Sequence, residues 1–419
     1  MPGHEWTRRG VIAAAAAATV APRRIVAAAQ QTWSNAVLVM PDGTTQEGGI
    51  RIRAGIIEAV GPDVTGGVDL NGAWVVPGFT DAGCRLGLLE VGLERSTHDL
   101  GAGENQALDA RATDGYNPRS ELIPVARVNG ITSVVLNPES QGMIPGQAAL
   151  MRTVGTRLSD AIIDAPIGLC MNLGRAASGN DGPTSRIGVM RAWRSFFEEH
   201  PKPEPSKKRK RSAAKKDADE SSGSSPNAEA VARQLRTGEL LALIRANRAD
   251  DIERALELVS EHDLRAVLVG CVEGHLVADS IAAAELPVFL GPIDAQPSSF
   301  QHPHARYENA ALLHDAGVKL AFRSGDAHGV RKLPTLAGLA VAHGLPWSAA
   351  MQALTIHPMD VLGQPTLGRL SVGAEATFFV ADGDPLQPRT DVRAVYVRGQ
   401  AASMETRQTR LYEEFKELW

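Results

Sequence analysis

Three cysteines are the first residues that could do chemistry, because a thiolate is both a nucleophile and a metal ligand. Cys84, Cys170 and Cys271 lie far apart in the sequence, and none belongs to a Cys-x-x-Cys pair. An odd number of cysteines with this spacing argues against a disulfide framework and against a structural zinc site. Each cysteine falls near the end of an apolar, strand-like run, so a thiol nucleophile is one hypothesis.

The elements that would position such residues alternate between strand-like and helical segments. Residues 250–261 have apolar side chains at helical spacing, so we expect a helix there. Continuous apolar runs, which are typical of parallel strands buried on both faces, occur at 74–76, 133–136, 167–169, 240–244, 266–269, 288–290 and 318–322. This alternation predicts a parallel α/β core. With residues 146–151 as a further strand, the count fits an eight-stranded barrel.

The segments that flank this region have a different pattern. Residues 37–68 alternate polar and apolar side chains between turn residues such as Asp42-Gly43. The strand-like segments 376–381 (ATFFVA) and 392–397 (VRAVYV) repeat this texture near the other end of the chain. We therefore expect short strands on both sides of the barrel in the sequence.

Composition excludes several classes of partner. The chain has 419 residues, of which 43 % are hydrophobic, enough for one large barrel with a satellite domain. A formal net charge of -5 gives no general attraction to nucleic acid or to an anionic membrane. After the first 30 residues, no run approaches the roughly 20 apolar residues that a membrane span requires. We therefore expect no nucleic-acid partner and no membrane span.

Residues 1–30 resemble an export signal. Arg8-Arg9 precedes an Ala-rich apolar run, and a further alanine stretch provides the small-x-small pattern of a cleavage site. The paired arginines are typical of twin-arginine signals. The sequence therefore predicts delivery to the periplasm or cell envelope, with a short amphipathic or disordered leader as the alternative.

Residues 202–227 break the pattern of strands and helices. They contain no apolar residue beyond alanine and proline, and they are basic first, then acidic and serine-rich. Because such a segment cannot offset the entropy cost of ordering, we predict a disordered insertion. Its KKRKR run could bind nucleic acid, but a solvated surface loop is the interpretation that an exported protein favours.

Several motifs resemble those of the amidohydrolase superfamily, most closely its imidazolonepropionase-like and periplasmic branches. They follow one another in the order of the family and cover nearly all of residues 35–403 outside the insertion. The motifs are GAWVVPGFTD (72–81), NRADD (247–251), VEG (272–274), SGD (324–326), LTIHP (354–358) and GRLSVGAEA (368–376). The resemblance implies a distorted TIM barrel over 73–366. It also implies a β-sandwich assembled from 31–72 and 367–403. We expect a C-terminal helix over 404–419.

The resemblance also implies metal-dependent hydrolysis of non-peptide carbon–nitrogen bonds. In that chemistry, zinc or another divalent ion lowers the pKa of a bound water, and an aspartate after the last strand takes the proton. Only that aspartate, Asp326, is retained. The positions of the ligand histidines hold Gly83 and Arg85 after the first strand, Arg245 and Asn247 at the fifth, and Gly270 at the sixth.

Too few ligands therefore remain for the metal of this family. A catalytic zinc site needs about three protein ligands, and this chain supplies one at the matched positions. The guanidinium groups of Arg85 and Arg245 would also repel a divalent cation. We accordingly expect no metal cofactor and a degenerate site.

The altered site suggests two roles for the residues that replaced the ligands. Arg85, Arg245, Asn247 and Asp326 could form a pocket for a small anionic ligand, because a guanidinium group matches carboxylate or phosphate. Alternatively, Asp326 could neutralise one arginine in a buried ion pair. Cys84 takes the middle position of the former His-x-His, so strand alternation points its thiol away from the cavity.

Three classes of function remain open. The first is a non-hydrolytic binding or interaction protein, and the second is an active carbon–nitrogen hydrolase with an unusual site centred on Asp326. The third is a structural subunit that pairs with an active paralogue, and self-association into a homo-oligomer is a further option. One fold supports many functions, so the fold alone does not choose among them. The missing metal ligands favour the first class, and the active hydrolase is the alternative.

Overall fold

The computed structural model describes residues 30–138, 141–178, 182–203, 226–293 and 300–418. The export signal predicted for residues 1–30 lies outside this part of the chain, apart from Gln30. Most of the insertion predicted for 202–227 lies outside it as well. At the edges of that insertion, Lys202 forms an ion pair with Asp263 and helix α5 begins at Pro226.

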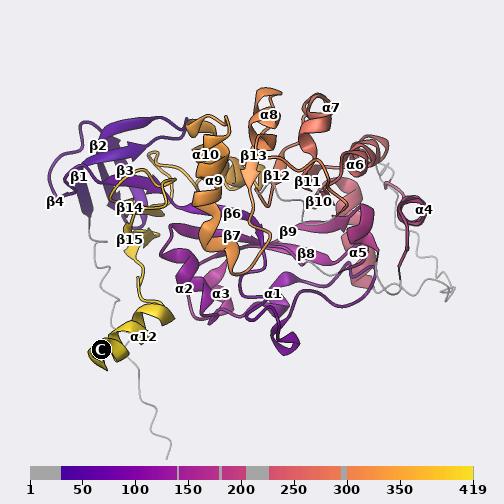
Figure 1. Ribbon diagram of the computed structural model, residues 1–419, viewed down its shortest axis with the longest axis horizontal. Coiled ribbons are helices and arrows are strands. Elements are labelled where there is room, and N and C mark those ends of the chain that lie inside the picture. Colours follow the sequence, from indigo (N-terminus) through magenta and orange to yellow (C-terminus); the bar gives the residue numbers. More distant parts are fainter. Residues whose placement is uncertain (1–29, 139–140, 179–181, 204–225, 294–299, 419) are drawn as a thin grey trace, which may run out of the picture.

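Two eight-stranded sheets form the framework of the molecule (Figure 1). The first sheet is built from both flanking segments, in the order β16-β15-β14-β5-β1-β2-β3 with β4 beside β1. Its strands are β1 (Gln31–Val39), β2 (Thr45–Arg53), β3 (Ile56–Gly61), β4 (Val68–Asp69), β5 (Trp74–Pro77), β14 (Phe378–Ala381), β15 (Val392–Val397) and β16 (Gln400–Ala401). The sheet folds around an apolar core in which Trp33, Phe378 and Tyr396 contact one another.

The second sheet curves into a nearly closed barrel, in the order β13-β12-β11-β10-β9-β8-β7-β6. Its strands are β6 (Phe79–Cys84), β7 (Ile131–Leu136), β8 (Gly146–Arg152), β9 (Ile162–Asn172), β10 (Leu241–Ala246), β11 (Ala266–Gly270), β12 (Val288–Leu290) and β13 (Leu320–Phe322). The predicted barrel with a β-sandwich is therefore confirmed. The barrel begins with β6, because β5 pairs with β1 and β14 in the sandwich sheet.

The expectation of an all-parallel barrel was wrong for β8, which runs antiparallel to both of its neighbours. The reason is the length of the connections. Parallel neighbours need a crossover of a dozen or more residues, and residues 137–145 and 153–161 are too short to provide one. The other strand pairs of the barrel are parallel.

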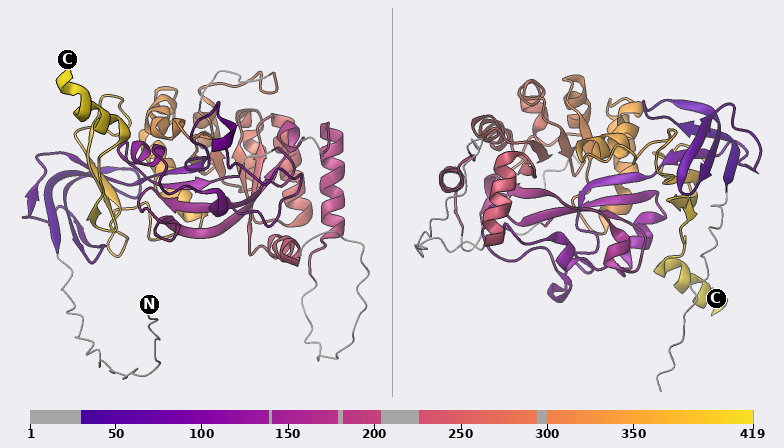
Figure 2. Two further views of the ribbon diagram at one scale, coloured as in Figure 1. Left: turned by 90° about the horizontal axis from the view of Figure 1, so that it is seen from below. Right: turned by 180° about the vertical axis from the view of Figure 1, so that it is seen from behind.

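Helices cover the outside of the barrel (Figures 1 and 2). The α-helices are α1 (Ala112–Gly115), α2 (Leu122–Arg127), α3 (Leu158–Ala161), α4 (Arg186–Glu199), α5 (Pro226–Thr237), α6 (Ala249–His262), α7 (Ala278–Ala283), α8 (Asn309–Asp315), α9 (Leu333–Ala342), α10 (Trp347–Leu354), α11 (Ile356–Val361) and α12 (Arg407–Phe415). Helix α6 coincides with the helix predicted over 250–261. Two acidic residues in its first turn favour its start, and Asp263 ends it in the left-handed conformation.

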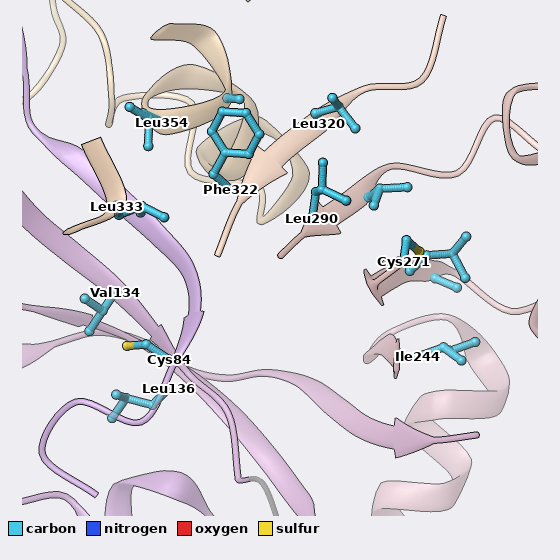
Figure 3. Packing of buried hydrophobic residues seen from close by; sticks show 14 of the residues in the cluster. Cys84, Val134, Leu136, Ile244, Cys271, Leu290, Leu320, Phe322, Leu333 and Leu354 are labelled. Atoms are coloured by element: carbon cyan, nitrogen blue, oxygen red, sulfur yellow. The ribbon is translucent and has the colours of Figure 1, made fainter. Parts of the chain in front are cut away.

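Two apolar layers hold the barrel together. Inside it, side chains such as Leu243, Val269 and Phe289 fill the space between the strands. A larger cluster lies between the strands and the helices, and Figure 3 shows part of it around Phe322 and Leu354. No helix of the described residues is long and apolar enough to cross a bilayer.

A buried ion pair joins the barrel to the sandwich. The guanidinium of Arg152 at the end of β8 donates to both carboxylate oxygens of Glu375 just before β14, at 2.6 and 2.8 Å. The two side chains are only 12 % and 15 % exposed. Both partners are therefore largely desolvated, so losing one leaves the other without its counter-charge.

We expect Glu375→Ala to lower the free energy of unfolding by about 3 kcal/mol, because it strips the counter-charge from a mostly buried arginine. Urea denaturation followed by circular dichroism would measure the loss. The matched control is Glu257→Ala, which breaks an exposed pair with Arg254 and should change the free energy of unfolding far less, because solvent screens exposed pairs. Equal losses in the two variants would contradict the role assigned to Arg152 and Glu375.

Candidate functional site

The site is built at the seam where the first and last strands of the barrel meet. The backbone N–H groups of Gly325 and Arg85 donate to the carbonyls of Gly83 and Asp326 at 2.9 and 3.0 Å. The carboxylate of Asp81 on β6 adds a side-chain bridge, because its Oδ1 accepts from the N–H groups of Gly83 (3.0 Å) and Ser324 (3.1 Å). The seam therefore joins β6 to the SGD motif directly after β13.

Asp81 is fully buried, and desolvation raises its pKa to about 6. Hydrogen bonds from Ser324 and Gly83 and the charge of Arg323 lower the pKa only in part. Within the described residues, no hydrogen-bond partner is found for its second oxygen, Oδ2. An acid at this seam was not among the residues that the sequence singled out.

A buried arginine lies beside Gly83, which the sequence matched to a ligand histidine of the family. Arg323, directly after β13, is 2 % exposed. A Cβ atom at Gly83 would come within 2.7 Å of its Nε and 2.8 Å of Nδ2 of Asn137. The space that a side chain at position 83 would need is therefore taken up by a guanidinium group and an amide.

The sixth-strand position is filled in the same manner. A Cβ atom at Gly270 would meet Oδ1 of Asn247 at 2.1 Å, and Gly270 has a φ of +97°. A histidine there would both clash and strain the backbone. Gly83 and Gly270 thus make room for polar side chains from neighbouring strands.

Arg85 and Asp326 lie together, as one of the two hypotheses expected. Nη2 of Arg85 is 3.7 Å from Oδ1 of Asp326 and donates to the carbonyl of Gly325 at 3.0 Å. The expectation of a buried pair was wrong, however, because the side chain of Asp326 is 46 % exposed. Its carboxylate mainly accepts from the N–H groups of Ala327 and Gly329 at 2.7 and 3.1 Å, which fixes the turn into the next helix.

Arg245 belongs to β10, at a different part of the barrel mouth. Its carbonyl accepts from the N–H of Leu173, and its charge contributes to lowering the pKa of His302, after desolvation as the main cause. Asp251, 7 % exposed, receives a two-pronged pair from Arg186 at 2.7 and 2.9 Å. Arginines of this rim are therefore close to both carboxylate and imidazole groups.

The cysteines do not offer a reactive thiol. All three are buried, and desolvation raises the pKa of Cys271 to about 12. Cys84 packs beside Val134 and Leu136 in the layer between strands and helices, as strand alternation predicted (Figure 3). Because the nucleophile is the thiolate, burial argues against the hypothesis of a thiol nucleophile.

The residues at the mouth do not fit the metal that the fold family uses. Among the described residues, no group of three or more His, Cys, Asp or Glu side chains could hold a metal ion. The guanidinium of Arg323 brings positive charge to the position itself, and like charges repel strongly where water is excluded. We therefore derive no catalytic step through a metal.

No family model matches the chain. It is 24 % identical over 374 residues to the amidohydrolase TasK of Hapsidospora irregularis, and it spans 37 % of that protein's length with 78 % of its own. The crystal structure of an amidohydrolase from Thermotoga maritima MSB8 superimposes with a TM-score of 0.80 at 24 % identity, covering 89 % of this chain and 99 % of that one. The zinc-complexed atrazine chlorohydrolase TrzN of Arthrobacter aurescens TC1 gives 0.52 at 16 % identity, covering 92 % and 99 %.

The chain thus has the fold of the amidohydrolases, a distorted barrel joined to a β-sandwich. Its similarity in sequence to the amidohydrolase TasK agrees with that fold.

The buried acid predicts a pH dependence of stability. The folded state raises the pKa of Asp81 from 3.8 to about 6, so folding favours its protonated form. Its contribution to stability is fully present below about pH 4 and is lost as pH rises to about 6. We expect Asp81→Asn, which keeps an acceptor for Gly83 and Ser324, to equal the parent protein below pH 4. Above pH 6 it should be more stable by up to about 3 kcal/mol.

Urea denaturation from pH 3.5 to 8 would test this expectation on both proteins, together with the exposed control Asp63→Asn. The control should follow the parent protein at every pH. A constant difference between Asp81→Asn and the parent across that range would contradict the raised pKa of Asp81.

Proposed function

We propose that this chain is a non-hydrolytic protein of the amidohydrolase fold that binds a small anionic ligand at the barrel mouth. The observation that carries the proposal is Arg323, a 2 % exposed guanidinium that fills the space beside Gly83. A permanently cationic group there favours an anion and opposes a divalent ion. The hydrolytic activity after which the relatives are named therefore need not apply to this chain.

The chemistry of the mouth narrows the class of ligand. Arg245 supplies a guanidinium fork that suits carboxylate or phosphate, and Arg323 adds a buried positive charge beside Gly83. Three buried acceptor oxygens, Asp81 Oδ2 and Asn137 Oδ1 near Arg323 and Asn247 Oδ1 beside Gly270, have no hydrogen-bond partner among the described residues. Buried acceptors usually find a donor, so the ligand that suits the site is an anion that also carries N–H or O–H groups. Arg85 and Asp326 lie at the seam, where solvent reaches both side chains.

An active carbon–nitrogen hydrolase is the alternative function. It is favoured by Asp326, which the chain retains at the position of the family's general base and which is accessible to solvent. In that case Asp326→Asn should abolish hydrolysis with little cost in stability, because its ion pair is long and half exposed. A third possibility, a structural subunit of an active paralogue, would reveal itself as a co-purified hydrolase.

Ligand binding can be tested by thermal shift and calorimetry with acetate, phosphate, glycine and N-acetylglycine. We expect carboxylates that carry an N–H group to bind most tightly. Arg245→Gln should weaken that binding about 10- to 100-fold, because it removes a charge-assisted hydrogen bond of roughly 1.5–3 kcal/mol. The control Arg331→Gln, on an exposed arginine of a neighbouring turn, should leave the affinity unchanged.

Elemental analysis of the purified protein would complement this test. The proposal expects no stoichiometric divalent ion and no stabilisation by added zinc or manganese. It would be overturned by a bound ion in equal amount to the protein, or by amide hydrolysis that zinc supports and Asp326→Asn removes.

We also propose that the chain is exported through its Arg8-Arg9 motif. These residues lie outside the described part of the structure, so the proposal rests on sequence alone. With both arginines changed to lysine, we expect a tagged protein to accumulate in the cytoplasm, because the twin-arginine route reads that pair. Unchanged delivery by cell fractionation would contradict it.

A further inference from the structure

Helix α12 leaves a row of apolar side chains in water. Every residue from 407 to 418, through α12 and the short 3-10 turn Lys416–Leu418, is exposed. The exposed fractions are 40 % for Leu411, 67 % for Tyr412, 44 % for Phe415 and 74 % for Leu418. In Figures 1 and 2 the helix stands beside the sandwich and projects beyond the body of the protein. Contiguous exposed apolar side chains of this kind mark interaction surfaces.

The start of the helix is nevertheless fixed. Thr406 and Thr409 form a capping box, in which Oγ1 of Thr406 accepts from the N–H of Thr409 at 3.2 Å. Arg410 donates to both carboxylate oxygens of Glu121 near α2, at 2.9 and 3.0 Å. A helix of nine residues with no buried side chain is marginal in water. The capping box and the ion pair with Glu121 therefore hold the helix in place, although no other described residues bury its apolar face.

The charges of α12 run against its own dipole. Within α12, Arg407 and Arg410 lie in the first half and Glu413 and Glu414 in the second, while Lys416 and Glu417 follow in the 3-10 turn. Basic residues at the N-terminal end and acidic residues at the C-terminal end are each unfavourable to a lone helix. Two such helices packed antiparallel, however, place the basic half of each against the acidic half of the other.

We infer that this face, defined as Arg407, Leu411, Glu414, Phe415 and Leu418, pairs antiparallel with the same face of a second copy of the chain. Arg407, Leu411, Glu414 and Leu418 are spaced by four, three and four residues, which puts them on one side of the helix. A twofold axis makes such a face complementary to itself. Three basic and three acidic residues over 407–418 cancel, so the face has no net attraction to an anionic membrane.

The dimer should be weak, because one short helix from each copy forms an interface smaller than the standard size. We expect half-dissociation at concentrations on the order of micromolar, as for interfaces at the low end of the size range. Sedimentation velocity of the full chain over a dilution series would give the dissociation constant. Leu411→Asp should raise it at least about tenfold, because it buries an unpaired charge in the centre of the contact.

The matched control is Leu93→Asp, a fully exposed leucine in a loop of the barrel. It should leave the dissociation constant unchanged. Thermal melting at low concentration should be unchanged for Leu93→Asp and at most slightly lowered for Leu411→Asp, because Leu411 is 40 % exposed in the monomer.

A charge exchange tests the antiparallel arrangement. Arg407 and Glu414 form no ion pair among the contacts of the described residues. Arg407→Glu alone and Glu414→Arg alone should each weaken the dimer, because like charges then face each other. The double variant Arg407→Glu/Glu414→Arg should restore it, and mixing the two single variants should give a heterodimer tighter than either homodimer.

The inference is overturned if the chain stays monomeric at high micromolar concentration, or if Leu411→Asp and Leu93→Asp behave alike. It is also overturned if the double variant stays as weak as the single ones. Flotation with phosphatidylglycerol vesicles tests the alternative that the apolar face of α12 binds a membrane surface. Vesicle binding by a monomeric chain that Leu411→Asp abolishes would assign α12 to a membrane surface and would contradict the dimer.

Discussion

Closure of the barrel between β6 and β13 is the constraint on which the site depends. Backbone hydrogen bonds alone join the two segments at only a few points, and the carboxylate of Asp81 supplies the remaining link to Gly83 and Ser324. A carboxylate this deeply buried is costly unless charge and hydrogen bonds compensate it. The positive charge of Arg323 is part of that compensation. The cation at the mouth and the acid at the seam are therefore parts of one arrangement.

This arrangement links the glycines of the site to the packing of the barrel. Arg323 and Asn247 occupy the space beside Gly83 and Gly270. A histidine at position 83 would collide with Arg323 and disturb the charge balance of Asp81. A metal-binding histidine at either position would thus require further changes around it.

Much of the fold could be predicted from the sequence, because buried strands are long enough here to appear as continuous apolar runs. β7, β10, β11 and β12 were found in this way, and α6 by its period. The antiparallel direction of β8 was missed because an apolar run does not show in which direction a strand runs. The short connections on both sides of β8 did carry that information. The boundary at β5 was missed because a strand of the sandwich has the same apolar character as a strand of the barrel.

The candidate site was less predictable than the fold. Arg85 and Asp326 were expected to meet, yet sequence could not show that solvent reaches Asp326. Arg323 was overlooked because it directly precedes the SGD motif, in which attention fell on Asp326. Arginine is also rarely buried. Its position directly after the apolar run 318–322 was the available signal. Asp81 was hidden for the same reason, inside a motif interpreted as the entry to the first strand.

The three buried thiols can report which part of the protein opens. Cys170 belongs to the layer inside the barrel, whereas Cys84 and Cys271 belong to the layer beneath the helices. Because all three are closed to solvent in the folded state, an alkylating reagent reaches each one only when its own layer parts. The order in which they become labelled therefore distinguishes a helix lifting from the barrel from the barrel itself coming apart.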